Sequence, residues 1–180
     1  MSSVKRATLT AVCIALCAVL PLAFHAVGLG AAFSPIHLPV LLCGLLCGGL
    51  YGGFCGVAGP LISSLTTGMP AAAQLAYMIP EILLYGLAAG LLFRRIHTRS
   101  LTADLYLSLI PAMLLGRIAG GAARAIVFQT TGRAYSLALW VSAYLTGSIP
   151  AILVQLILIP ALVLILIKAG LIPERRKQNA

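Results

Sequence analysis

Acidic residues are scarce in this chain. It has 3 Asp or Glu residues and 12 Lys or Arg residues among 180, and 8% of its residues are charged, whereas 61% are hydrophobic. A soluble domain carries about 25% charged residues. The composition therefore excludes a soluble globular protein and predicts one embedded in the lipid bilayer. A membrane-spanning helix needs roughly 20 apolar residues, so there is room for about six helices and for no separate soluble domain.

Catalytic motifs are also missing. The sequence contains no G-x-S-x-G, H-E-x-x-H or Walker A motif, so it indicates neither a hydrolase site nor ATP hydrolysis by the chain itself. Of the three carboxylates, Glu81 alone lies well inside a hydrophobic stretch, and Asp104 and Glu174 lie at the edges of such stretches. Paired acid–base chemistry has no second carboxylate available. We therefore predict that the protein is not an enzyme and uses no cofactor.

The cysteines do not follow a metal-binding pattern. All five lie in apolar stretches, at Cys13, Cys17, Cys43, Cys47 and Cys55. A metal site that includes His37 is one interpretation, but no C-x-x-C spacing or adjacent carboxylate supports it. The pattern favours small packing residues and no metal site.

Six hydrophobic stretches, separated by glycines, prolines and polar or basic loops, predict an all-α integral membrane protein. We expect a single transmembrane domain over residues 1–180, with helices at about 4–27, 37–50, 52–66, 72–93, 101–128 and 137–169. Glycines and prolines mark most of the breaks because they interrupt helical patterns.

The basic residues predict the orientation of this bundle. They gather at Lys5–Arg6, in the loop 94–99 and in the tail that follows Lys168. Lys and Arg are enriched in cytoplasmic loops, so six helices with both termini in the cytoplasm are the consistent topology. The net charge of +9 is thereby explained without a nucleic acid. The external loops, at about 28–36, 67–71 and 129–136, are expected to cover a pocket that opens outward.

Three charged residues lie inside the hydrophobic stretches: Glu81, Arg117 and Arg124. A charge within lipid is costly and usually marks a pathway or a binding site. At 1.5 Å per residue, Glu81 and Arg117 lie roughly 13 Å and 16 Å below the outer face. They could form a structural ion pair, and Arg124, about 6 Å deep, could reach the headgroups. The alternative is a polar pocket for an anionic or hydrogen-bond-rich solute.

Other polar and aromatic residues are predicted at similar depth. Tyr85 lies one turn from Glu81, and Gln74 lies nearer the outer face. Trp140 and Tyr144 are four residues apart and form either an interfacial aromatic belt or a stacking wall for a flat ligand. His37 either packs at the start of its helix or contacts the ligand.

Small residues form a stripe near the start of the chain. Ala7, Ala11 and Ala15 recur at four-residue spacing, which permits close approach of another helix. The stripe serves either internal packing or the docking of a partner membrane protein.

Three features together resemble the substrate-binding S components of energy-coupling factor (ECF) transporters. These are the stripe Ala7-x-x-x-Ala11-x-x-x-Ala15, the segment Phe33–Gly44 with its glycine-rich turn, and the loop Gly68–Pro70 followed by Glu81 and Tyr85–Leu87. The resemblance implies an ECF S-component-like bundle of six helices in a prokaryotic cell membrane. It also implies capture of a vitamin-like solute at the outer face, docking on a transmembrane coupling (T) subunit with two ATPase subunits, and toppling to release the solute.

The substrate is left open, because S components share little binding-site sequence. A weakly acidic or polar heterocyclic vitamin best suits the predicted lining of Glu81, Arg117, Arg124 and the aromatic residues. Two alternatives remain for the function: a self-sufficient small permease and a membrane scaffold protein that binds no ligand.

Overall fold

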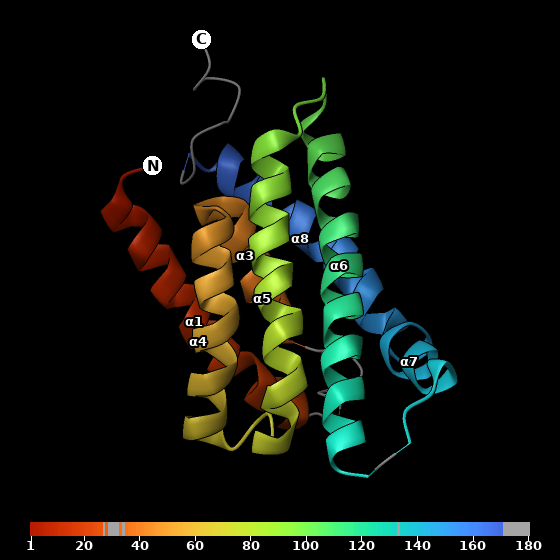
Figure 1. Ribbon diagram of the computed structural model, residues 1–180. Helices are drawn as coiled ribbons and strands as arrows, with labels where there is room; N and C mark the ends of the chain where they lie inside the picture. The colour runs from red at the N-terminus through yellow and green to blue at the C-terminus, as the bar shows by residue number, and fades with distance from the viewer. Residues whose placement is uncertain (27, 29–32, 34, 133, 171–180) are drawn as a thin grey trace.

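The computed structural model describes residues 1–26, 28, 33, 35–132 and 134–170 (Figure 1). This part of the chain is helical and contains no strand. Its helices are α1 (Ser3–Ala26), α3 (His37–Cys47), α4 (Gly49–Thr67), α5 (Ala72–Arg95), α6 (Leu101–Thr130), α7 (Leu137–Tyr144), the short 3₁₀ helix η1 (Thr146–Ser148) and α8 (Ile149–Lys168).

Four helical segments are long and apolar enough to cross a membrane. They are α1, α5, α6 and the segment Leu137–Lys168, which combines α7, η1 and α8. In contrast, α3 has only 11 residues, or roughly 16 Å at 1.5 Å per residue, about half the thickness of a hydrocarbon core. The described residues therefore form an all-helical bundle with four candidate spans.

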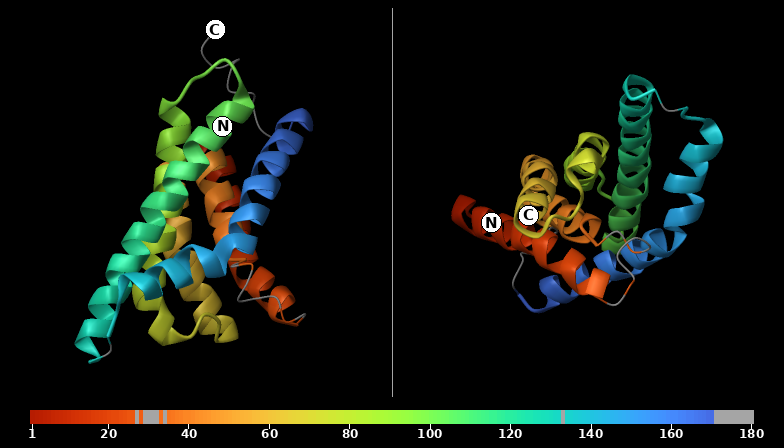
Figure 2. Two further views of the ribbon diagram at one scale, coloured as in Figure 1. Left: turned by 90° about the vertical axis from the view of Figure 1, so that its right-hand side faces the viewer. Right: turned by 90° about the horizontal axis from the view of Figure 1, so that it is seen from below.

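Basic residues gather at one end of the bundle. The first turns of α1, the loop between α5 and α6, and the last turn of α8 lie together there (Figures 1 and 2). We call this the basic end; it carries Lys5, Arg94, Arg95 and Lys168. The turn from α4 to α5 and the last turn of α6 lie at the opposite end (Figure 1).

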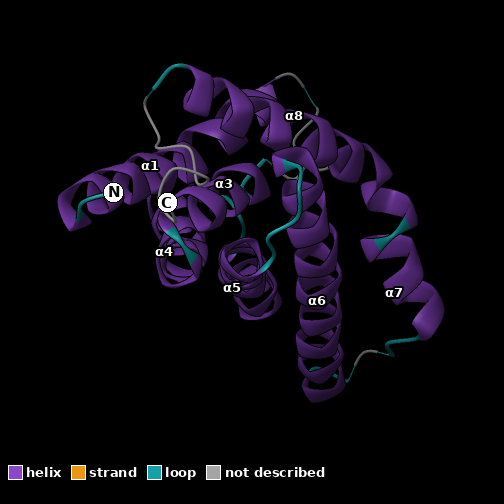
Figure 3. Cartoon of the chain, turned by 90° about the horizontal axis from the view of Figure 1, so that it is seen from above, coloured by secondary structure: helices purple, strands orange, loops and turns teal. Residues whose placement is uncertain are grey.

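The helices stand in two layers when seen from the basic end (Figure 3). One layer contains α4, α5 and α6, and behind it lie α1, α3 and α8. The central helix α5 packs against α3, α4 and α6. One buried cluster, which includes Leu41, Leu105 and Ile159, joins α3, α5, α6 and α8. All five cysteines are buried, and together with Val40 and Ile82 they form a second cluster among α1, α3, α4 and α5.

Glycines bring α3, α4 and α5 into backbone contact. A Cβ atom added at Gly44 would overlap the backbone of Gly86, and one added at Gly90 would overlap the backbone of Gly49. A Cβ at Gly52 would lie 2.5 Å from the Gly86 carbonyl oxygen. Small residues permit such approach between helices within a membrane. Side chains at these positions would force the three helices apart.

The turn between α3 and α4 lies earlier than predicted. We expected helices to end at residue 50 and restart at 52, but α3 ends at Cys47 and α4 begins at Gly49. Gly48 makes the turn alone with φ +104°, a conformation that residues with a Cβ rarely adopt. The Arg94 Nη2 group donates a hydrogen bond to the Cys47 carbonyl, at 3.0 Å, and so caps the end of α3.

The helix predicted at about 137–169 is interrupted. The chain leaves the α-helical path after Tyr144 and resumes it at Ile149. Pro150 has no N–H group to donate to the carbonyl one turn earlier, and Gly147 has a low helix propensity. As a result, α7 turns away from the axis of α8 and crosses the opposite end of the bundle (Figure 2).

Candidate functional site

A cavity of about 520 Å³ lies toward the opposite end of the bundle. Residues from α1, α3, α5, α6, α7 and α8 enclose it, together with the turn that precedes α5. Its lining consists of Pro21, His25, Pro35, Ile36, His37, Gly68, Met69, Pro70, Ala71, Gln74, Tyr77, Met78, Glu81, Arg117, Arg124, Ala143, Tyr144, Ser148 and Gln155. Small-molecule sites commonly have volumes of about 300–1,000 Å³, so a compact metabolite would fit.

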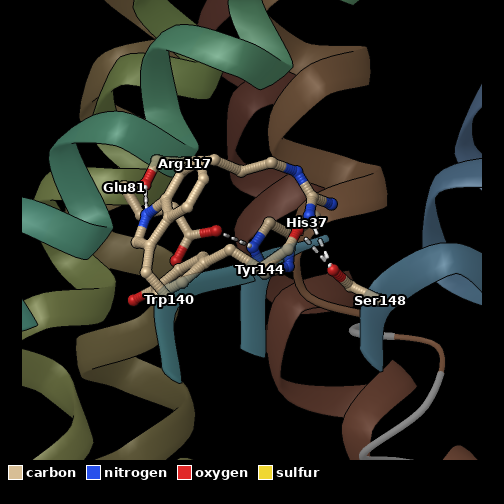
Figure 4. Close-up of polar contacts among 6 residues, drawn as sticks. All are labelled: His37, Glu81, Arg117, Trp140, Tyr144 and Ser148. Carbon is tan, nitrogen blue, oxygen red and sulfur yellow. Dashed lines mark hydrogen bonds and ion pairs between the residues drawn. The ribbon is translucent and has the colours of Figure 1, made fainter. Parts of the chain in front are cut away.

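Glu81 on α5 and His37 at the start of α3 form a buried pair in this cavity (Figure 4). The distance between Glu81 Oε1 and His37 Nε2 is 3.5 Å. The carboxyl side chain fits against α6 because Gly120 has no side chain: a Cβ there would lie 2.8 Å from the Glu81 Cβ. The His37 ring meets the ring of Tyr85 edge to face, with centroids 5.1 Å apart. Contacts on both sides therefore hold the pair in place.

Arg117 does not pair with Glu81. No ion pair within 4.0 Å joins the two side chains, so the structural ion pair considered from the sequence is not formed. Instead, Arg117 Nη1 donates a hydrogen bond of 2.6 Å to Ser148 Oγ. Ser148 in turn donates to the Tyr144 carbonyl at 2.7 Å. The matching depths of Glu81 and Arg117 constrained their positions along the helices but not the direction of the side chains.

The backbone of Arg117 makes a further contact with α7. Its carbonyl accepts a hydrogen bond of 3.3 Å from Trp140 Nε1 (Figure 4). A single residue of α6 thus holds both the helix before the break and the serine at the break.

Arg124 lies two turns beyond Arg117 on α6 and also lines the cavity. Its guanidinium carbon is 5.1 Å from the ring centroid of Tyr77 and 5.1 Å from that of Phe128. Cation–π contacts of this kind stabilise an arginine within an apolar environment. Its Nε atom is buried and finds no hydrogen-bond partner among the residues that the structure describes. The side chain therefore lies between these two rings at the wall of the cavity.

Comparison with known proteins identifies the family. The protein-family model for the substrate-specific component of ECF transporters matches residues 5–167 of the chain. The chain belongs to this family. It is accordingly a substrate-specific (S) subunit of an ECF transporter, a membrane protein that works with T and ATPase subunits and is not itself catalytic. No curated protein and no solved structure gives a significant match.

Most of the residues predicted for the site of this S component meet at the cavity. Those that line it are His37, Gln74, Glu81, Arg117, Arg124 and Tyr144. They come from α3, α5, α6 and α7, segments that are distant in sequence.

Tyr85 and Trp140 were predicted to line the site but do not reach the cavity wall. Tyr85 is fully buried against α6, where a Cβ at Gly116 would lie 2.6 Å from its ring. Trp140 packs on Gly121 and lies next to Tyr144, with ring centroids 6.2 Å apart. It lines a smaller cavity of about 370 Å³ between α6 and the start of α7. The Tyr85 ring contacts His37 and the Trp140 ring contacts Tyr144, so each ring packs against a residue that lines the cavity.

Several lining residues were absent from the predicted site. His25 belongs to the last turn of α1, and Met69 and Pro70 precede α5. Gln155 on α8 is 1% exposed, and no described residue donates a hydrogen bond to its Oε1 atom. A buried amide deep within a hydrophobic helix is a signal of function, and this signal was available in the sequence.

The alanine stripe lies on the surface of the S component. Ala7, Ala11 and Ala15 are exposed, whereas Cys13 and Cys17 of the same helix are buried. The stripe therefore does not serve internal packing. The three alanines belong to the half of α1 that starts at the basic end of the molecule.

The cysteines pack among α1, α3 and α4 and donate weak hydrogen bonds to nearby oxygen atoms. Cys17 Sγ lies 3.8 Å from the Ile36 carbonyl oxygen, and Cys43 Sγ lies 3.5 Å from Thr10 Oγ1. Within the described ranges, no three His, Cys, Asp or Glu residues are arranged to hold a metal ion.

Proposed function

We propose that this S component captures a vitamin or related micronutrient in the 520 Å³ cavity, at the outer face of a prokaryotic plasma membrane. The position of the cavity at the end opposite the basic end carries this proposal. Lys and Arg mark the cytoplasmic side of a membrane protein. With the basic end in the cytoplasm, both termini are inside and the cavity faces outward.

The lining of the cavity supports capture of a polar solute. Arginine side chains, a buried carboxylate and the Gln155 amide converge there from different helices. Tyr77 and Tyr144 add aromatic surface to the same cavity. A few placed polar groups in an apolar wall are typical of small-molecule sites. A weakly acidic or polar heterocyclic vitamin matches this lining best.

Release would depend on partner subunits. The exposed stripe of Ala7, Ala11 and Ala15 offers the T subunit a face on which helices can approach closely. Two ATPase subunits would supply the energy, and the S component would topple in the membrane to carry the cavity toward the cytoplasm.

A substitution in the stripe tests this function against the two alternatives. We expect Ala11→Trp to leave solute binding unchanged in purified S component but to reduce uptake by cells that express the whole transporter. Overpacking a helix contact costs about 1–3 kcal/mol, which weakens docking about 5- to 150-fold. Ala161→Trp, at an exposed alanine of α8, is the matched control and should retain uptake.

The alternatives give different results in the same assays. Uptake by Ala11→Trp at the control level, or uptake without T and ATPase subunits, would indicate a self-sufficient permease. A scaffold protein would give no stabilisation in a thermal-shift screen of water-soluble vitamins. A solute that binds the folded state at a thousandfold excess over its Kd stabilises it by about 4 kcal/mol, so a real substrate should be evident.

A further inference from the structure

The charges that line the cavity do not balance. Arg117 and Arg124 both line it, and Glu81 is the only acidic residue among the described lining residues. That carboxylate lies 3.5 Å from His37, and no ion pair within 4.0 Å joins it to either arginine. With the histidines counted as neutral, one positive charge therefore remains in excess. Within a membrane such an imbalance is costly unless a bound anion relieves it.

The hydrogen-bonding capacity of the two arginines is largely unused. Arg117 is 5% exposed, and within the described ranges its guanidinium group donates to one side chain, that of Ser148. Arg124 has aromatic contacts to Tyr77 and Phe128, and its Nε–H has no acceptor. A guanidinium group carries five N–H donors in a planar fork that matches a carboxylate. The two arginine side chains thus have free N–H donors that an acceptor with two oxygen atoms, such as a carboxylate, would satisfy.

The Gln155 side chain has an acceptor atom without a donor, whereas the arginines have donors without an acceptor. Its side chain is buried in α8 and lines the same cavity, and its Oε1 atom accepts no hydrogen bond. Buried polar atoms in proteins are nearly always paired. The atom thus lacks an N–H or O–H donor, and the described part of the chain supplies none.

We propose that the solute of this site is a monoanionic carboxylic acid that carries no cationic group. Its carboxylate lies between Arg117 and Arg124, and an uncharged N–H or O–H group of the same molecule donates to Gln155. This inference rests on the proposed function and names the chemical class of its substrate.

Other charge types fit this cavity less well. A phosphate monoester carries about −1.5 to −2 charges at neutral pH and would replace the positive excess with a negative one. A zwitterion would leave the excess unchanged, and its ammonium group would have to displace His37 from Glu81. A neutral solute would also leave the excess positive charge unrelieved.

Retention of a natural solute tests the class directly. The full-length S component in detergent is incubated with the small-molecule fraction of yeast extract and washed, and the retained compounds are released by denaturation and identified by mass spectrometry. We expect a compound with one carboxylate and no cationic group. A retained neutral, zwitterionic, cationic or phosphorylated compound overturns this inference and leaves solute capture intact. If nothing is retained, the proposed function fails, and the inference fails with it.

Variants show whether the arginines select the charge. The affinity of the retained acid is compared with that of its carboxamide in the wild type and in Arg124→Gln. Loss of a charge-assisted hydrogen bond should lower the acid-to-amide ratio of affinities by about 10- to 100-fold. Arg124 is half-buried, so this variant is expected to fold even if Arg117→Gln does not. Arg95→Gln, at an exposed arginine of the basic end, is the matched control and should leave the ratio unchanged. An unchanged ratio in Arg124→Gln overturns the assignment.

Discussion

Gly120 provides a sharp test of how α6 holds the Glu81–His37 pair. An alanine Cβ at this position would lie 2.8 Å from the Glu81 Cβ and 2.9 Å from its Oε2. Carbon atoms in favourable contact are about 3.5–4.0 Å apart, so Glu81 or the helix must move by roughly 0.7 Å or more. The Cβ atom cannot rotate away, because it is fixed to the backbone of α5. The substitution therefore separates the helices or displaces the carboxylate.

The expected cost follows from two opposing effects. Overpacking a closely packed interior typically costs about 1–3 kcal/mol, whereas replacing a helical glycine with alanine gains up to about 1 kcal/mol. Gly120→Ala should therefore lower the free energy of unfolding by up to about 2 kcal/mol. It should also weaken solute binding, since Glu81 lines the cavity.

Equilibrium unfolding in mixed detergent and SDS micelles measures this difference. Gly53→Ala on α4 is the matched control, because its Cβ would lie 3.6 Å from the Leu87 Cβ, an ordinary contact. The control should be as stable as the wild type or slightly more stable. If Gly120→Ala were as stable as Gly53→Ala and bound solute normally, the close contact between Gly120 and Glu81 would be refuted.

Two further substitutions test the wall that α7 and α8 form. Ser148→Ala removes the oxygen that accepts from Arg117 and should destabilise the protein by about 1.5–3 kcal/mol; Ser148→Thr, which keeps a hydroxyl, should restore most of this in the same unfolding assay. Gln155→Leu removes a buried atom without a partner and should leave the solute-free protein as stable as the wild type or more stable, while solute affinity measured by equilibrium dialysis falls. A parallel loss of stability and affinity in Gln155→Leu would contradict this account of Gln155.

The sequence was sufficient to find the charged residues of the site. Glu81, Arg117 and Arg124 are conspicuous because each interrupts a hydrophobic stretch, and all three line one cavity. The cost of a charge in lipid makes this kind of signal reliable. The pairing was not predictable, because the depth of a residue in the membrane does not fix the direction of its side chain. His37, not Arg117, is the partner of Glu81.

The aromatic residues show a second limit. Tyr85 shares a helix face with Glu81, yet its ring is fully buried against Gly116. Helical spacing identifies residues on a common face, but the side that meets the cavity depends on where the neighbouring helix has glycines. Trp140 similarly occupies the space at Gly121 and does not reach the cavity.

The break between α7 and α8 could not be predicted from hydropathy, because the whole segment Leu137–Lys168 is apolar. Pro150 lies at the break, but Pro80, Pro111 and Pro160 lie inside continuous helices. Proline is tolerated within transmembrane helices because neighbouring groups satisfy the freed carbonyl. The presence of a proline therefore could not show that the helix is interrupted near Pro150 and continuous at Pro80, Pro111 and Pro160.

The glycine contacts among α3, α4 and α5 also affect how the site can diversify. Gly44, Gly52, Gly86 and Gly90 have no space for a larger residue, so α4 holds the backbones of α3 and α5, which carry one wall of the cavity, in fixed positions. The wall that α7 and α8 contribute is attached to α6 through side chains such as Ser148 and Trp140. Substitutions in the second wall alter the lining without separating helix backbones. Related subunits could thus acquire different solutes by changes in the last quarter of the chain while the rest stays the same.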